Sequence, residues 1–165
     1  MVYITDKWEG QEFFSIKTIK YIEFFVGNAK QAVHFYRSIF GLKPLAYSGP
    51  ETGICSHVSY VLRKDKIHFI FTTPLISSHY SSEWLKKHGD GVRDIAFSVE
   101  NVYDSHESCL KRGAQEENSP STIKNEDGIY TKSSIKTYGE TIHSLIDDQQ
   151  YNGYWAPGFL ELNLP

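Results

Sequence analysis

The stretch that decides the fold reads IKYIEFFVGN at residues 19–28, and it recurs in altered form as VRDIAFSVEN at residues 92–101. The copies are 73 positions apart (92 − 19), and at this offset isoleucine, phenylalanine, valine and asparagine each fall on the same residue type. Each copy runs into a helical pattern that ends at a glycine, Gly41 in the first and Gly113 in the second. Two units of about half the chain predict a duplicated module, because solenoid repeats are shorter and more numerous. We therefore expect matched functional groups where the two copies meet.

The first unit, residues 17–74, is expected to run strand, helix and three strands. Its opening strand, residues 17–26, leads to Asn28, whose side chain can cap a helix by accepting from first-turn amides. One face of this helix is marked by apolar residues at spacings of three and four: Ala29, Ala32, Val33, Tyr36, Ile39 and Phe40. Further strands are predicted at residues 44–47, 57–63 and 66–73, and the polar turn RKDK predicts a hairpin between the last two.

The second unit, residues 90–150, repeats this plan after a short helix capped by Ser81 or Ser82. Its helix follows Asn101 and is expected to turn Val102, His106, Cys109 and Leu110 inward. Its strands are predicted at residues 92–99, near Gln115, and at residues 129–134 and 141–147. The fold class is therefore α+β, with two tandem βαβββ modules in one domain.

Three further segments flank or interrupt these modules. Residues 1–15 are expected to be a lead-in, and the polar stretch 116–128 is predicted to be a solvated loop. Residues 151–165 hold Trp, Tyr, Phe and Leu side chains that a solvated terminus would rarely carry. We expect this segment to pack on another surface, such as a further domain, and to serve as a linker to it.

Composition excludes several classes of protein. The net charge of −3 comes with scattered basic residues, which argues against a nucleic-acid partner. No secretory signal and no apolar run of membrane-spanning length is visible, so we expect a cytoplasmic protein without a membrane partner. Cys55 and Cys109 have no motif spacing and are interpreted as free thiols in a reducing compartment, with a disulfide between them as the alternative.

Seven histidines raise the question of a metal site. His88 and Asp90 have a His-x-Asp spacing, but their predicted place at a helix end favours an interaction with the helix dipole. His143 and Asp147 would share a strand face about 13 Å apart, too far for one ion. His106 lacks the further ligands that zinc needs, so packing is preferred. No serine nucleophile elbow and no phosphate-binding loop is present in the sequence.

Four strings carry a family resemblance across residues 17–158: YIEFFVGNAKQAVHFYRSIFGLKPLAYSGPETG, SYVLRKDKIHFIFTTPL, HGDGVRDIAFSVENV and YGETIHSLID. They resemble the amino-terminal half of the 4-hydroxyphenylpyruvate dioxygenase family and of the similar 4-hydroxymandelate synthases. The resemblance implies the vicinal-oxygen-chelate (glyoxalase/bleomycin-resistance-like) architecture, in which paired modules curl around a cavity. It also implies an Fe(II)-dependent enzyme of tyrosine catabolism about twice this long, with its two His ligands and one Glu ligand in a carboxy-terminal domain.

The ligand positions of that superfamily fall, by the same resemblance, on Tyr21, Asp94 and a closing strand that offers His143. These three side chains are expected to face the cavity. A phenol with a pKa of about 10 is a poor Fe(II) ligand at neutral pH, so no metal site, catalytic residue or bound cofactor is predicted in this chain. A buried Asp94 would need a partner such as Tyr21, His143 or Arg93.

The sequence therefore predicts the amino-terminal, non-catalytic domain of a 4-hydroxyphenylpyruvate dioxygenase-like enzyme. Its expected partners are its own carboxy-terminal domain and further copies of itself in a homo-oligomer. Three alternatives stay open: the corresponding domain of a 4-hydroxymandelate synthase, a stand-alone module that binds a small molecule, and a composite site that a dimer builds from Tyr21 and Asp94. An open reading frame beyond Pro165 would favour the two-domain enzymes over the stand-alone module.

Overall fold

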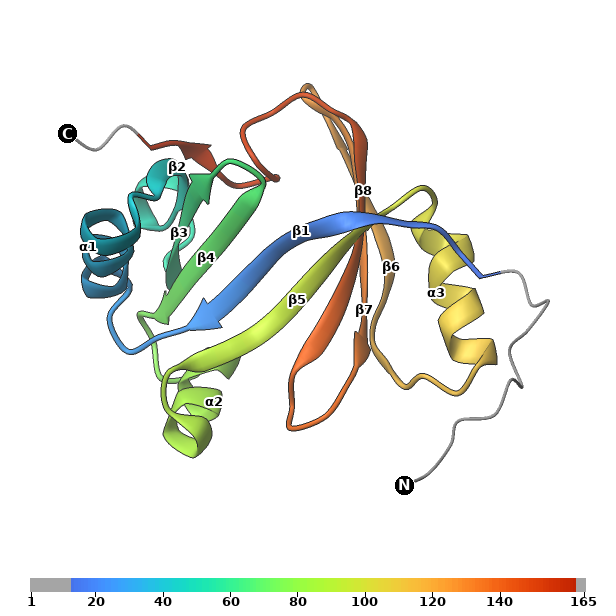
Figure 1. The fold of residues 1–165 in the computed structure, drawn as a ribbon, viewed down its shortest axis with the longest axis horizontal. Helices are drawn as coiled ribbons and strands as arrows, with labels where there is room; N and C mark the ends of the chain where they lie inside the picture. Colours follow the sequence, from blue (N-terminus) through green and yellow to red (C-terminus); the bar gives the residue numbers. More distant parts are fainter. Residues whose placement is uncertain (1–12, 163–165) are drawn as a thin grey trace.

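The computed structural model describes residues 13–162, which form one curled nine-stranded sheet flanked by helices (Figure 1). The predicted lead-in lies mostly outside these residues, as do the last three positions of the predicted linker. The strands are β1 Ile16–Phe25, β2 Lys43–Ser48, β3 His57–Lys64, β4 Ile67–Pro74, β5 Gly91–Val99, β6 Glu116–Asn125, β7 Gly128–Lys136, β8 Ile142–Tyr151 and β9 Leu160–Glu161. The helices are α1 Ala29–Phe40, α2 Tyr80–His88 and α3 Val102–Lys111, with a short 3₁₀ turn, Pro50–Thr52, after β2.

The duplication predicted from the sequence is visible in the order of the strands. The sheet runs β6-β7-β8-β5-β1-β4-β3-β2-β9, so each module keeps its own half, and β1 and β5 join the halves. These two strands are antiparallel, and Ile22 lies directly opposite Ile95. The two isoleucines are 73 positions apart (95 − 22), the offset of the sequence repeat, so the pseudo-twofold axis of the molecule passes between them. The predicted βαβββ fold is confirmed.

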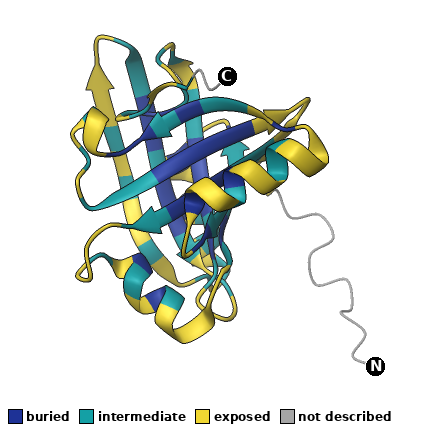
Figure 2. Ribbon diagram, turned by 90° about the vertical axis from the view of Figure 1, so that its left-hand side faces the viewer, coloured by how far each residue is buried: buried dark blue, intermediate teal, exposed yellow. Residues whose placement is uncertain are grey.

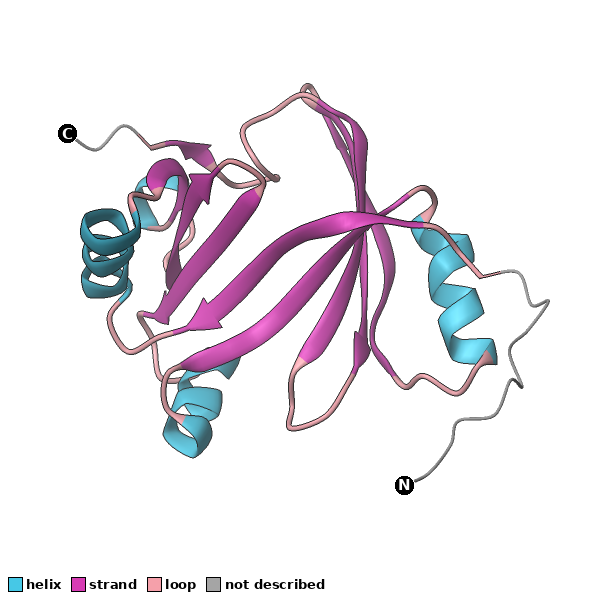
Figure 3. Cartoon of the chain, in the orientation of Figure 1, coloured by secondary structure: helices cyan, strands magenta, loops and turns pink. Residues whose placement is uncertain are grey.

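The same local signals start both outer helices. The Asn28 side chain accepts from Gln31 N at the start of α1, and Asn101 accepts from Tyr103 N and Asp104 N at the start of α3. Gly41 ends α1 with φ 68°, a left-handed conformation that glycine adopts at little cost. The two helices lie at opposite ends of the molecule, each on the outer face of its half-sheet (Figures 1 and 3).

Burial on these helices is narrower than predicted. On α1, Ala29 and Val33 are buried, whereas Ile39 and Phe40 are exposed. On α3, Val102 and His106 are buried and Cys109 is half-buried. The expectation that Leu110 points inward is wrong, because this side chain is exposed. Each helix covers only a narrow strip of its half-sheet, so the apolar stripe is wider than the surface available to bury it.

The expectation of a solvated loop over residues 116–128 is also wrong. This segment forms β6, an edge strand that pairs antiparallel with β7. Its side chains are mostly exposed, so the strand carries none of the apolar alternation that identifies a half-buried strand. Pro120 is tolerated because it lies at an edge, within the register irregularity between Asn118 and Ser121. The connecting helix likewise begins earlier than predicted, since α2 starts at Tyr80 with His79 as its cap.

The carboxy-terminal segment packs on the inner face of the sheet. Ala156 is buried in a cluster with Tyr21, and Trp155 and Phe159 pack against that cluster. Beyond it, β9 pairs with β2 and extends the sheet (Figure 1). The expectation that this apolar segment covers a surface therefore holds for residues 151–162, and the surface is that of the chain's own sheet.

Burial is concentrated in the central strands (Figure 2). The inner face carries a cluster around Tyr21, Val61, Ala96 and Ile146, and separate clusters lie under α1 and α3. Within residues 13–162, no helix has the length and apolar character needed to cross a bilayer.

Candidate functional site

Four polar side chains meet at the pseudo-twofold axis on the inner face of the sheet. We call Tyr21, Asp94, Lys132 and Ser144 the axis network. The Tyr21 hydroxyl donates to Asp94 Oδ2 over 3.0 Å, and Lys132 Nζ donates to the Tyr21 oxygen over 2.9 Å. Asp94 also accepts from Ser144 N at 3.0 Å and from Ser144 Oγ at 2.6 Å, while Lys132 Nζ lies 3.8 Å from its carboxylate. The 1 % exposed carboxylate of Asp94 is thereby fully engaged.

The pairing of Tyr21 with Asp94 follows from the duplication. The two residues occupy the same position in their modules, 73 positions apart, and the axis brings equivalent positions together. Burial raises the pKa of the Tyr21 hydroxyl well above its usual value, and the negative charge of Asp94 raises it further. Tyr21 is therefore a neutral phenol that keeps its proton and donates a hydrogen bond to Asp94.

A second carboxyl group, that of Glu23, lies two residues beyond Tyr21 on β1. Glu23 Oε1 accepts from Thr72 Oγ1 at 2.6 Å, and Thr72 shares a 2.7 Å hydrogen bond with Ser59. Burial of the carboxyl group raises the pKa of Glu23, whereas the positive charge of Lys132 works in the opposite direction. The inner face thus holds two carboxyl groups, one 3.8 Å from Lys132 Nζ and the other affected by the charge of that lysine.

The raised pKa of Glu23 predicts a dependence of stability on pH. Above the usual carboxyl pKa of 4.5, the folded protein binds more protons at Glu23 than the unfolded chain does. Rising pH then favours the unfolded state until the folded group has also lost its proton. We expect Glu23→Gln to remove this loss, so that the variant gains stability relative to the wild type as the pH rises above 4.5. Urea denaturation across this range measures the difference, and a constant difference between the two proteins would contradict the prediction.

The structure does not bring His143 into this group. Its Nδ1 lies 3.0 Å from the carbonyl oxygen of Ile95, and its ring lies 4.9 Å from the ring of Phe97. Phe97 belongs to the cluster under α3, so His143 lies on the helix-covered face of the sheet. Because side chains alternate along a strand, the next residue, Ser144, meets Asp94 instead.

Three inner residues, Lys132, Ser144 and Glu23, were missed from the sequence. Ser144 could have been found by carrying the alternation of β8 one residue further. Glu23 lies two residues beyond Tyr21 on the same strand, so the alternation of β1 also pointed to it, whereas Lys132 gave no signal because only the pairing of distant strands places it beside Asp94.

The remaining metal candidates make ordinary polar contacts. His88 closes α2 and its Nε2 lies 2.8 Å from Glu140 Oε2, while Asp90 accepts from the backbone of Gly27. His106 Nε2 lies 2.8 Å from Glu116 Oε2. Within residues 13–162, no three His, Cys, Asp or Glu side chains form a group that could hold a metal ion. Both cysteines are free, with Cys55 exposed and Cys109 half-buried.

The axis network does not suit Fe(II). The Fe(II) sites of non-haem oxygenases use two histidines and one carboxylate as ligands. In the axis network, Tyr21 provides a neutral phenol and Asp94 provides one carboxylate. The ammonium group of Lys132 lies 3.8 Å from that carboxylate. A fixed cation and hydrogen-bond donors compensate the negative charge that a metal ion would need.

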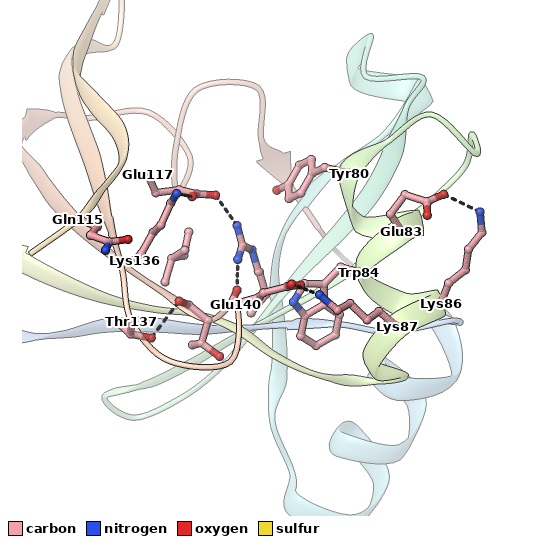
Figure 4. A pocket seen from close by; sticks show the side chains of 13 residues that line it. Tyr80, Glu83, Trp84, Lys86, Lys87, Gln115, Glu117, Lys136, Thr137 and Glu140 are labelled. Carbon is pink, nitrogen blue, oxygen red and sulfur yellow. Dashed lines mark hydrogen bonds and ion pairs between the residues drawn. The ribbon is translucent and has the colours of Figure 1, made fainter.

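A pocket of about 810 Å³ opens at the α2 end of the inner face (Figure 4). Tyr80 and Trp84 of α2 form one wall, and Glu117 of β6 and Lys136 of β7 lie on the opposite side (Figure 4). Phe25 of β1 packs behind the wall formed by α2. The centroid of its ring lies 5.4 Å from that of Tyr80 and 5.5 Å from that of Trp84, and both contacts are edge to face.

Charged groups join the two sides of this pocket. Arg93 of β5 donates to Glu117 over 2.8 Å and to the carbonyl oxygen of Glu140. The Glu140 carboxylate accepts from Lys87 and His88, and these hydrogen bonds lower its pKa to about 2. Arg93 reaches the pocket because β5 has a register shift at this point, between the pairs Glu23–Asp94 and Phe24–Val92.

The curled sheet of paired βαβββ modules and its inner cavity define a class of proteins. Residues 18–143 match the model of the Glyoxalase/Bleomycin resistance protein/Dioxygenase superfamily, and the chain belongs to this superfamily. Within it, the chain is similar to the amino-terminal domain of 4-hydroxyphenylpyruvate dioxygenases.

Two relatives illustrate this similarity. The 4-hydroxyphenylpyruvate dioxygenase of Dictyostelium discoideum is 42% identical over 141 residues, which are 84% of this chain and 38% of the relative. That of Danio rerio is 39% identical over 163 residues, covering 98% of this chain and 41% of the relative. The chain thus spans less than half the length of these relatives. A solved mutant of 4-hydroxymandelate synthase from Streptomyces coelicolor shares the fold, with a TM-score of 0.79 at 23% identity over 89% of this chain and 42% of that one.

Proposed function

We propose that this chain is the amino-terminal, non-catalytic domain of a 4-hydroxyphenylpyruvate dioxygenase-like enzyme. Such an enzyme converts 4-hydroxyphenylpyruvate and O2 to homogentisate and CO2 with Fe(II). The proposal rests on the 42% identity to a 4-hydroxyphenylpyruvate dioxygenase, in which the matched region makes up 38% of the relative's length. The iron ligands of the complete enzyme would lie in the carboxy-terminal domain.

The axis network supports a structural role for this half. Tyr21, Asp94, Lys132 and Ser144 satisfy one another, and they tie the two modules together where the superfamily elsewhere holds a metal. A closed set of hydrogen bonds stabilises one arrangement of the two half-sheets. In the proposed enzyme this domain packs on its own catalytic domain and contributes to a homo-oligomer.

The proposal predicts that the 165-residue chain has no turnover of its own. After anaerobic loading with Fe(II) and gel filtration, we expect far less than one iron atom per chain. We also expect no 4-hydroxyphenylpyruvate-dependent uptake of oxygen, because the axis network offers a cation no suitable donor set. Iron analysis and an oxygen electrode make the two measurements.

The longer protein is the control. A chain that continues past residue 165 into a second domain should bind iron and form homogentisate under the same conditions. Stoichiometric iron together with homogentisate formation by the 165-residue chain alone would overturn the proposal. Formation of 4-hydroxymandelate by the longer protein would instead assign the domain to a 4-hydroxymandelate synthase, an alternative for which the 23% identity to that enzyme shows the fold alone.

A further inference from the structure

The pocket at the α2 end carries two buried donors with no acceptor. Trp84 Nε1 and Arg93 Nε are enclosed, and no atom of the described residues accepts a hydrogen bond from either. The two donors come from α2 and β5, and both side chains line the pocket. Buried donors are nearly always paired in folded proteins, so two unpaired donors in one pocket point to an acceptor that binds there.

The charges around the pocket indicate the kind of acceptor. Four cationic side chains line it, Lys86, Lys87, Arg93 and Lys136, against three carboxylates, Glu83, Glu117 and Glu140. Glu117 forms ion pairs with two of the cations: its carboxylate oxygens lie 2.8 Å from Arg93 and 3.9 Å from Lys136. The pocket therefore has a surplus of one positive charge (4 − 3), on the side where Arg93 and Lys136 lie together.

The uncharged part of the lining is half polar, with Gln115, Thr137 and Thr141, and half apolar or aromatic. Tyr80, Trp84 and Ile142 offer flat or aliphatic surface beside the charged groups. The volume of about 810 Å³ lies within the range of small-molecule sites, and Tyr80, Trp84 and Ile142 give it apolar surface. Arginine is well suited to a carboxylate, because its planar guanidinium group can donate two parallel hydrogen bonds.

We propose that this pocket binds a small monocarboxylate with an apolar or aromatic body. The carboxylate lies between Arg93 and Lys136 and neutralises the surplus charge, and the body packs on Trp84 and Tyr80. Trp84 Nε1 and Arg93 Nε are enclosed in this structure, so contact of a ligand with them requires the turn that bears Glu140, whose carbonyl oxygen accepts from Arg93, to move on binding. This site is separate from the axis network and does not depend on the proposed dioxygenase role.

Phenylacetate is a suitable probe, and phenylacetamide is its neutral control of the same shape. In the 165-residue chain, titration with phenylacetate is expected to shift the indole NH signal of Trp84, which its loss in Trp84→Phe assigns. Phenylacetamide should bind at least tenfold more weakly, because it lacks the charge that Arg93 and Lys136 compensate.

Variants test the contacts. Lys136→Met, at an exposed position, should weaken phenylacetate binding about tenfold, and Arg93→Lys should weaken it by at least as much because the planar fork is lost. Lys111→Met removes a lysine of α3 that pairs with Glu107 and does not line the pocket, so its affinity should stay within twofold of the wild type.

Four results would overturn the proposal. The first is that roughly 10 mM phenylacetate leaves the indole NH signal of Trp84 unshifted. The second and third are that phenylacetamide binds as tightly as phenylacetate and that Lys136→Met keeps the wild-type affinity. The fourth is that the pocket binds inorganic phosphate more tightly than phenylacetate. Equal binding of the amide would indicate an apolar site, and preference for phosphate would indicate a phosphate site instead.

Discussion

Replacing Asp94 by alanine is expected to lower the free energy of unfolding by about 3–5 kcal/mol, one of the two largest effects in the molecule. The 1 % exposed carboxylate accepts from Tyr21, from Ser144 N and from Ser144 Oγ. Alanine leaves these buried donors unpaired at about 1–3 kcal/mol each, and it also removes the counter-charge of Lys132. Urea denaturation followed by circular dichroism at pH 7 measures the loss.

Two further variants test whether the loss of stability comes from the hydrogen bonds of the Asp94 carboxylate. Asp94→Asn keeps an oxygen that can accept from Ser144 N, so its loss should be smaller, about 1–3 kcal/mol. Glu126→Ala removes an exposed carboxylate and should change stability by less than about 0.5 kcal/mol. If Asp94→Ala were no more destabilising than Glu126→Ala, the axis network would not be what joins the two modules.

The second large effect is expected at Phe25, whose replacement by alanine should also cost about 3–5 kcal/mol. This side chain is 0% exposed and contacts both Tyr80 and Trp84 of α2 edge to face. Alanine would leave a cavity between β1 and α2 and remove two aromatic contacts. Hydrogen exchange should show a further consequence, with the amides of α2 losing more protection than those of α1.

Phe35→Ala is the matched control, because this phenylalanine is 52% exposed on the outer side of α1. Its loss should stay below about 1 kcal/mol, although its ring contacts Tyr36 and Phe40. Uniform loss of protection across all three helices in Phe25→Ala would mean that α2 has no separate dependence on this residue.

The duplication and its local signals could be read from the sequence because they are short-range. Asn28 and Asn101 cap their helices through atoms two or three residues away, and Gly41 ends α1 by its own conformation. The repeat offset of 73 also relates Tyr21 to Asp94, but the sequence left Tyr21, His143 and Arg93 open as partners of Asp94, and the structure brings Tyr21 to it. The predicted absence of metal in this chain stays a prediction that iron analysis tests.

Where the sequence alone misled, the deciding contacts join residues that are far apart in the chain. The pattern of β6 is polar because both its faces are largely exposed, so only pairing with β7 makes it a strand. The faces of β8 were resolved only when its neighbours were in place, which put Ser144 rather than His143 beside Asp94.

The sequence by itself thus determined the two modules and their helix boundaries, because caps, periodicity and an internal repeat are written into neighbouring residues. The tertiary structure decided that, of the open partners, Tyr21 meets Asp94 in the axis network. Only the tertiary structure decided that Lys132 completes this network and that Trp155 packs on the chain's own sheet. It also decided that Arg93 and Trp84 share a pocket. Each of these depends on how far the sheet curls, and curvature is a sum over many strand pairings that no single segment encodes.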